Sequence, residues 1–283
     1  MLQLRRRGTA SSTRSVREGA IVRRPLLEVR DLRIETGEGD SRLSLVRGVS
    51  FSISGGQTVA LAGESGAGKT MTALAIVRLL PAGVRVASGS VLLDGIDLAR
   101  SAEERMESVR GDRIAMVFQD PLSSLNPVYT IGRQIAEAIV AHRMGIASVA
   151  REVERLLALV EMPKESARSY PHQLSGGMRQ RATIAMALAG NPDLLIADEP
   201  TTALDVTIQA QILDLLGRLR EHAQMSVLLI THDLGVVASL ADMVHVMRDG
   251  VLLESGTAED VFSRPQAEYT RQLLEVVPVL EAG

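Results

Sequence analysis

The eight residues Gly63-Glu-Ser-Gly-Ala-Gly-Lys-Thr70 follow the pattern G-x-x-x-x-G-K-[S/T]. The apolar run Thr58–Ala62 before them predicts a short buried strand, and the residues from about Lys69 to Leu80 are predicted to form a helix. Glycines let backbone N–H groups turn toward phosphate oxygens, and a helix N-terminus adds partial positive charge. The pattern therefore predicts a phosphate-binding loop, in which Lys69 reaches the β- and γ-phosphates and Thr70 ligates Mg²⁺.

Two acidic residues, Asp198 and Glu199, end a second apolar run at Leu194–Ala197. We expect this run to form a strand beside Thr58–Ala62 and to bring both carboxylates to the phosphate loop. Asp198 would hold Mg²⁺ through water, and Glu199 would orient or deprotonate an attacking water. A single acid at a strand end is more often a helix cap or a salt-bridge partner, but two acids in a chain with a phosphate loop favour a catalytic site.

A third motif, Leu174-Ser-Gly-Gly177, opens a predicted helix over Met178–Ala189. Ser175 is a good N-cap residue, and the two glycines expose the helix N-terminus, so a second anion site is expected there. A free-standing P-loop kinase would use the same phosphate loop but would need no second site of this kind.

Composition excludes several other classes of protein. The chain has 283 residues, with 31 basic and 34 acidic side chains, so a nucleic-acid binder that works by bulk positive charge is disfavoured. It has no cysteine, which excludes disulfides, cysteine-ligated metal centres and a cysteine nucleophile. Aromatic residues make up only 2 %, which disfavours stacking platforms for single-stranded nucleic acid. No apolar run approaches the ~18 residues that a membrane span needs.

The order of predicted elements indicates an α/β protein. Residues 1–25 carry seven arginines and one acid and are expected to be a disordered basic tail or an over-called start, although their composition could also mimic a transit peptide or a lipid-binding arm. Ordered structure should begin near Leu26. Helical periodicity covers Tyr129–Glu161. The other predicted strands are Leu26–Ile34, Leu45–Ser54, Gly89–Leu93, Arg113–Phe118, Val227–Thr231 and Met243–Met247.

Taken together, these motifs resemble those of an ABC-type ATPase subunit. Leu174–Gly177 matches the signature motif of that family, and the two sites above match its Walker A and Walker B motifs. Gln119 resembles the Q-loop glutamine, Thr202-Ala-Leu-Asp205 the D-loop, and His232 the switch histidine. The resemblance covers roughly Leu26 to Pro278.

The resemblance implies a P-loop NTPase (RecA-like) core with a mostly parallel sheet and an N-terminal antiparallel β subdomain. An α-helical subdomain at about 120–189 would be inserted into an ATPase domain over 26–278, and 279–283 would be a C-terminal tail.

Four longer stretches are similar to the ATPases of oligopeptide, dipeptide and nickel importers, in particular to the first of two paired ATPases. They are FQDPLSSLNP at Phe118–Pro127, SYPHQLSGGMRQR at Ser169–Arg181, ADEPTTALDVTIQAQIL at Ala197–Leu213 and EYTRQLL at Glu268–Leu274. The chain departs from the family at one position. The family usually stacks adenine on an aromatic residue, which falls near Asp40 here, and no aromatic residue occurs before Phe51. Apolar side chains or Arg42 would have to hold the base.

The family works as a head-to-tail dimer with two ATP molecules between the subunits, and this implies roles for the matched residues. The expected catalytic residues are Glu199, His232 and Gln119, and the expected Mg²⁺ ligands are Thr70, Gln119 and Asp198. ATP would be bound by Gly63, Glu64, Ser65, Gly66, Ala67, Gly68, Lys69, Thr70 and Met71, and by Ser175, Gly176 and Gly177 across the dimer.

The resemblance also implies the partners and the place of work. The expected partners are a second ABC ATPase, two integral-membrane permease subunits and, indirectly, an extracytoplasmic solute-binding protein. No nucleic-acid partner is expected. The chain would work as a peripheral protein at the cytoplasmic face of the inner membrane. An ABC exporter ATPase and a non-transport ABC ATPase are the alternatives. A DNA-maintenance ATPase would place a long coiled coil in the 106 positions between Lys69 and Ser175, and no heptad run fills them.

Overall fold

Alternating apolar and polar residues near the start of the chain form an antiparallel sheet. The computed structural model describes residues 25–275, apart from 38, 40, 41, 144 and 203. Except for Pro25, the tails expected at 1–25 and 279–283 therefore lie outside the described residues. The strand order is β2-β1-β4-β5. The strands are β1 (Leu27–Thr36), β2 (Leu43–Ile53), β4 (Val84–Leu93) and β5 (Ile96–Asp97).

The second sheet carries the phosphate loop and is mostly parallel. Its strand order is β10-β9-β3-β8-β7-β6, and only β9 and β10 pair in the antiparallel sense. The central strands β3, β7 and β8 are buried along their whole length, as expected for strands covered on both faces. The strands are β3 (Thr58–Ala62), β6 (Ile114–Val117), β7 (Leu194–Asp198), β8 (Ser226–Thr231), β9 (Met243–Arg248) and β10 (Val251–Thr257).

The structure corrects two expectations. The strand that carries the acids was expected beside the strand of the phosphate loop, but β8 pairs with both and separates them. The carboxyl ends of parallel strands meet at one edge of the sheet, so Asp198 still reaches the loop across this intervening strand. The predicted helix Lys69–Leu80 is also too long: α1 ends at Ile76 because Arg78 adopts a left-handed conformation with φ of 55°.

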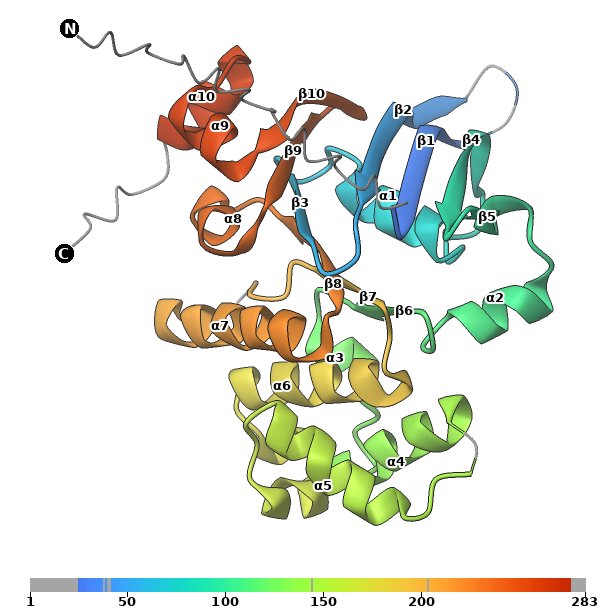
Figure 1. Ribbon diagram of the computed structural model, residues 1–283, viewed down its shortest axis with the longest axis vertical. Coiled ribbons are helices and arrows are strands. Elements are labelled where there is room, and N and C mark those ends of the chain that lie inside the picture. The colour runs from blue at the N-terminus through green and yellow to red at the C-terminus, as the bar shows by residue number, and fades with distance from the viewer. Residues whose placement is uncertain (1–24, 38, 40–41, 144, 203, 276–283) are drawn as a thin grey trace, which may run out of the picture.

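Between β6 and β7 the described chain is helical, and these helices lie together on one side of the second sheet, as Figure 1 shows. The predicted subdomain at about 120–189 falls in this stretch. Its elements are α3 (Pro121–Ser124), α4 (Ile131–His142), α5 (Val149–Leu159), η3 (Lys164–Arg168), η4 (Pro171–Gln173), α6 (Gly176–Ala187) and η5 (Leu188–Gly190).

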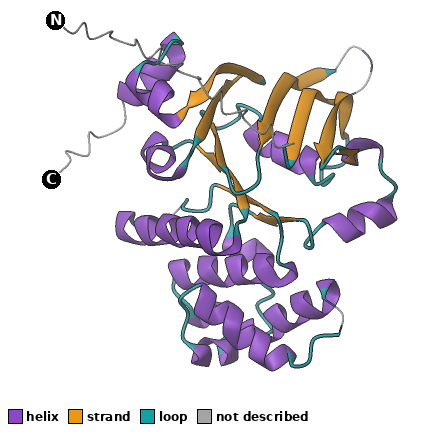
Figure 2. Ribbon diagram, in the orientation of Figure 1, coloured by secondary structure: helices purple, strands orange, loops and turns teal. Residues whose placement is uncertain are grey.

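The remaining helices lie outside this stretch, as Figure 2 shows. They are α1 (Lys69–Ile76), η2 (Leu98–Arg100), α2 (Glu103–Val109), α7 (Val206–Ala223), α8 (Leu234–Leu240), α9 (Ala258–Ser263) and α10 (Glu268–Glu275). None of the helices in the described part of the chain is both long and apolar enough to cross a membrane.

The second sheet separates two large hydrophobic clusters because successive side chains of a strand point to opposite faces. In β7, Leu194 and Ile196 pack into the cluster that contains α1 and the first sheet. Leu195 and Ala197 pack into the cluster that contains α4, α5, α6 and α7. A smaller cluster joins β3 and β9 to α8, α9 and α10. The phosphate loop therefore sits at the edge of a sheet that is packed on both faces.

A buried histidine of β9 makes the stability of this core depend on pH. His245 is only 7 % exposed, and its Nδ1 lies 2.8 Å from the Ser255 hydroxyl. Burial lowers the pKa of His245 from 6.5 to about 4. The unfolded chain thus takes up this proton at a higher pH than the folded protein, so stability is lost as the pH falls from 6.5 toward 4.

We expect His245→Gln to remove this loss, which amounts to roughly 3 kcal/mol of unfolding free energy. Denaturant unfolding at several pH values should show a flatter dependence between pH 6.5 and 4 in the variant than in the wild-type protein. His172→Gln, at an exposed histidine, is the control and should behave like the wild-type protein. Equal slopes in the wild-type protein and His245→Gln would contradict the assignment.

Candidate functional site

The loop between β3 and α1 has a shape that requires glycine at two positions. Gly63 has φ of 148°, and a Cβ atom there would lie 2.0 Å from the carbonyl oxygen of Met247. Gly68, the N-cap residue of α1, has φ of 103°, and a Cβ atom there would lie 2.9 Å from the carbonyl oxygen of Leu45. Neighbouring strands therefore press directly against the loop, and they fix its path around the start of α1.

The ammonium group of Lys69 is buried inside this loop. Its Nζ donates hydrogen bonds to the carbonyl oxygens of Gly63 at 2.7 Å and Glu64 at 2.8 Å. Burial lowers the pKa of Lys69, while the charges of Glu199, Asp198 and Glu64 oppose that shift. An ammonium group has three N–H donors, so the third can serve an incoming phosphate oxygen.

Asp198 and Thr70 meet at the edge of the second sheet. Asp198 ends β7 and is only 2 % exposed, and the Thr70 hydroxyl donates to its Oδ1 at 3.2 Å. Burial raises the pKa of Asp198, a shift that the Thr70 hydrogen bond opposes. A hydroxyl and a carboxylate are the hard oxygen ligands that Mg²⁺ prefers, and this ion commonly uses only one or two carboxylates together with substrate phosphates. The pair therefore fits a nucleotide-bound Mg²⁺.

Glu199 is the centre of a hydrogen-bond cluster. Gln119 Nε2 and the Thr202 hydroxyl donate to its Oε2 at 2.9 and 2.8 Å, and His232 Nδ1 lies 3.2 Å from its Oε1. Burial raises the pKa of Glu199, but the bonds from Thr202 and His232 outweigh burial and leave the pKa below its usual value. Its φ of 46° is left-handed, which is strained for a non-glycine residue.

These groups surround one cleft of about 700 Å³. Three predicted loop residues, Gly63, Glu64 and Ala67, do not line the cleft. The carbonyl oxygens of Gly63 and Glu64 nevertheless accept the hydrogen bonds that position Lys69. Asp198 and His232 do not line the cleft either. Each contacts a residue that does: Asp198 bonds Thr70, and His232 lies against Glu199. The predicted residues that line the cleft are Ser65, Gly66, Gly68, Lys69, Thr70, Met71, Gln119 and Glu199.

Other residues of the site were not predicted from the sequence. Leu43, Leu45 and Arg47 of β2 line the same cleft, and Leu43 is 60 % exposed. The expected stacking position near Asp40 lies outside the described residues. Arg42, the alternative for holding the base, pairs with Glu35 at 3.6 Å and does not line the cleft.

The third motif lies apart from this cleft. Ser175 caps α6 by accepting a hydrogen bond from the Met178 N–H at 3.3 Å. A Cβ atom at Gly177 would lie 2.5 Å from Ile208 Cγ2, so α6 begins tightly against α7. None of Ser175, Gly176 and Gly177 lines the cleft around Lys69. The N-terminus of α6 is therefore not part of the cleft that its own chain forms around Lys69.

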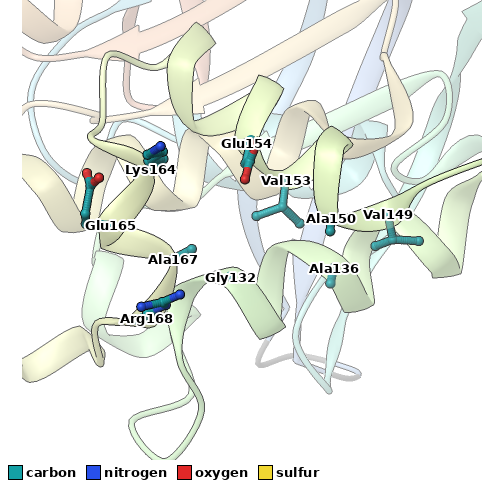
Figure 3. A pocket seen from close by; sticks show the side chains of 10 residues that line it. All are labelled: Gly132, Ala136, Val149, Ala150, Val153, Glu154, Lys164, Glu165, Ala167 and Arg168. Carbon is teal, nitrogen blue, oxygen red and sulfur yellow. The ribbon is translucent and has the colours of Figure 1, made fainter.

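A separate hollow of about 640 Å³ lies among α4, α5 and η3 (Figure 3). Small and apolar side chains, such as Ala136 and Val153, line it together with the charged residues Glu154, Lys164 and Arg168. None of the predicted site residues lines it. It is therefore distinct from the cleft that holds the phosphate loop.

Comparison with known proteins places the chain in a family. The family model described as ABC transporter matches residues 46–202. The dipeptide transport ATP-binding protein DppD of Bacillus subtilis (strain 168) is 48 % identical over 260 residues, which cover 90 % of this chain and 78 % of that protein. The peptidoglycan transport ATP-binding protein YejF of Agrobacterium fabrum is 50 % identical over 258 residues. That match covers 90 % of this chain but only 47 % of YejF, so the chain spans about half of that relative.

The fold agrees with solved structures as well. The dimeric ATP-binding cassette MJ0796, solved in a post-hydrolysis state with ADP and Pi, superposes with a TM-score of 0.73 at 27 % sequence identity. The match covers 82 % of this chain and 98 % of that one. The predicted combination of an antiparallel N-terminal sheet, a mostly parallel core sheet and inserted helices is thereby confirmed. The chain belongs to the ABC transporter family and is an ATP-binding cassette ATPase of the group that includes the dipeptide transport protein DppD.

Proposed function

We propose that this ATPase powers the import of a peptide, or of a related small solute such as nickel, from the cytoplasmic face of the inner membrane. The observation that carries the catalytic part is the placement of Glu199 among three hydrogen-bonding groups beside the phosphate loop. The substrate class is supported by the similarity to DppD, a dipeptide transport protein, and by the importer-like stretches of the sequence.

ATP binding is assigned to the loop and to Lys69. The backbone N–H groups at the start of α1 and the helix dipole would hold the phosphates, while Lys69 would neutralise charge on the β- and γ-phosphates. The apolar side chains of Leu43 and Leu45 are well placed in the cleft to contact the base, which supports the apolar alternative for adenine.

Mg²⁺ is assigned to Thr70 and Asp198, with Gln119 as the third predicted ligand. When bound, the ion would neutralise charge that develops on the phosphates. Gln119 directs its amide nitrogen at Glu199, and its amide oxygen is the group that could reach the ion.

Hydrolysis is assigned to Glu199, helped by His232 and Gln119. Because its pKa is lowered, Glu199 is ionised at neutral pH and is a weak base. This favours the orienting and polarising of an attacking water over removal of its proton before the reaction. His232 would hydrogen-bond the γ-phosphate and the water, and its side chain is exposed enough to do so, at 57 %.

The partner that completes each site is a second ABC ATPase. Ser175, Gly176 and Gly177 lie away from the cleft of their own chain, so the anion site at the start of α6 would serve the nucleotide of the other subunit. The similarity to the first of two paired ATPases supports a heterodimer.

Permease subunits are assigned to a groove of about 490 Å³ between the core and the helical stretch. Leu79 and Phe118 line it with 45 % and 40 % of their surface exposed, and His142 and Met186 line it too. Such exposed apolar side chains suit a short helix from one of the two permeases. Gln119 directly follows Phe118, so docking here would be coupled to the nucleotide. The extracytoplasmic solute-binding protein would act only through the permeases.

An exporter ATPase and a non-transport ABC ATPase remain the alternative functions. The stretch Phe118–Pro127, with its importer-like sequence, speaks against the first. The helical stretch Asp120–Ala189 consists of short helices rather than a long coiled coil, which speaks against the DNA-maintenance type. The direction of ATP-driven solute movement in vesicles that hold the whole transporter separates importer from exporter.

We expect Lys69→Ala to weaken ATP binding by roughly ten- to a hundredfold, because a charge-assisted hydrogen bond to phosphate is lost. Calorimetric titration with Mg-ATP measures this. Lys164→Ala removes the only other lysine of the sequence, which is exposed and lies in the separate hollow, and should bind ATP normally. Undiminished affinity in Lys69→Ala would count against the phosphate role.

We expect Glu199→Gln to abolish steady-state hydrolysis and ATP-driven solute uptake into vesicles while ATP binding is retained, because the amide cannot polarise the water. Binding, phosphate release and uptake are measured on the same preparation. Glu154→Gln is a matched control, since that exposed carboxylate lies in the separate hollow among α4, α5 and η3. Hydrolysis near the wild-type rate in Glu199→Gln would contradict the catalytic role of Glu199.

A further inference from the structure

The C-terminal helix α10 touches the phosphate loop through a single tyrosine. Tyr269 is only 5 % exposed and packs into the cluster formed with β3, β9, α8 and α9. Its hydroxyl oxygen accepts a hydrogen bond from the backbone N–H of Glu64 at 3.1 Å. The two residues are 205 positions apart in the sequence, so this contact connects the last described helix with the second residue of the loop.

Glu64 is held on both sides by this arrangement. Its N–H donates to Tyr269, and its carbonyl oxygen accepts from Lys69 Nζ at 2.8 Å. The residue that Tyr269 holds by its N–H is therefore the same residue whose carbonyl oxygen orients the ammonium group of Lys69. A rotation of the peptide group before Glu64, which the tyrosine restrains, would also disturb the Gly63 carbonyl that accepts from Lys69 at 2.7 Å.

The helix that carries Tyr269 is itself fixed to the core. The Glu254 carboxylate on β10 accepts from the N–H groups of Gln266 at 2.8 Å and Ala267 at 3.0 Å, just before α10 begins. The guanidinium carbon of Arg248 lies 4.6 Å from the centre of the Tyr269 ring, over its face. Burial raises the pKa of Tyr269, so its hydroxyl remains neutral at physiological pH. The ring thus has little freedom to move away from the loop.

We propose that Tyr269 is a positioning residue for ATP binding, which sets the backbone of Glu64 and through it the ammonium group of Lys69. It does not contact the nucleotide cleft itself. The inference rests on the proposed role of the loop and Lys69 in binding phosphate. A preorganised loop binds more tightly than one that must be ordered by its ligand, so loss of the restraint should raise the dissociation constant and spare the chemical step.

The test compares Tyr269→Phe with Thr270→Val. Tyr269→Phe removes the hydroxyl and keeps the buried ring. Thr270→Val removes a buried hydroxyl from the next residue of α10, one that makes no hydrogen bond to the loop. For Tyr269→Phe we expect Kd and KM for Mg-ATP to rise about three- to tenfold, with kcat at saturating ATP unchanged. Thr270→Val should match the wild-type protein in all three.

Amide hydrogen exchange gives a second measurement that needs no nucleotide. The Glu64 N–H should exchange faster in Tyr269→Phe than in the wild-type protein or in Thr270→Val, since its acceptor is gone. Unchanged Kd in Tyr269→Phe, or an equal rise in Thr270→Val, would overturn the inference. Lys69→Ala separates failure of the proposed function from failure of this inference. If Lys69→Ala also binds ATP normally, the loop has no phosphate role and the inference about Tyr269 is wrong as well.

Discussion

The ammonium group of Lys69, buried beside two carboxylates and two backbone carbonyls, is the constraint on which the rest of this site depends. A buried charge is tolerated only when it is paired and hydrogen-bonded. Gly63 and Glu64 supply the carbonyl acceptors, and Asp198 and Glu199 supply the opposite charge. This arrangement requires a loop with left-handed glycines, and it requires the strands β3 and β7 to end at the same edge of the sheet.

The two carboxylates at that edge have opposite environments. Burial raises the pKa of Asp198, whereas the hydrogen bonds to Glu199 lower its pKa despite partial burial. Neighbouring titratable groups whose pKa values are pushed apart often divide the work of a site. A cation close by would stabilise the ionised form of Asp198, whereas Glu199 stays ionised without one. This difference supports a role for Asp198 in metal binding and for Glu199 in orienting the attacking water.

The sequence predicted most of the chemistry because it lies in short, contiguous motifs. The loop and the pair Asp198 and Glu199 could be found from local patterns, and Gln119 and His232 from the resemblance to the ABC family. The structure places these residues in one cleft or in contact with residues that line it. Strand order could not be found this way, because a buried apolar run carries no mark of its neighbours. The expected pairing of β7 with β3 was therefore wrong, and β8 lies between them.

Contacts between residues far apart in the chain were missed for the same reason. No local pattern joins Tyr269 to Glu64, and only the packing of α10 against the core reveals that bond. Thr202 was noted as part of a motif, but its hydrogen bond to Glu199 depends on the turn after β7. Leu43 sits in the cleft because β2 passes the loop, which its sequence does not indicate.

We propose that one chain holds half of each nucleotide site, since Ser175 and Gly177 do not line the cleft around Lys69. The most direct test is the solution mass of Glu199→Gln by light scattering with and without Mg-ATP, measured alone and with the second ATPase of the transporter. We expect ATP to produce a particle of two cassettes, either two copies of this chain or one of each ATPase. Bound ATP with a mass of one cassette in both mixtures would contradict it.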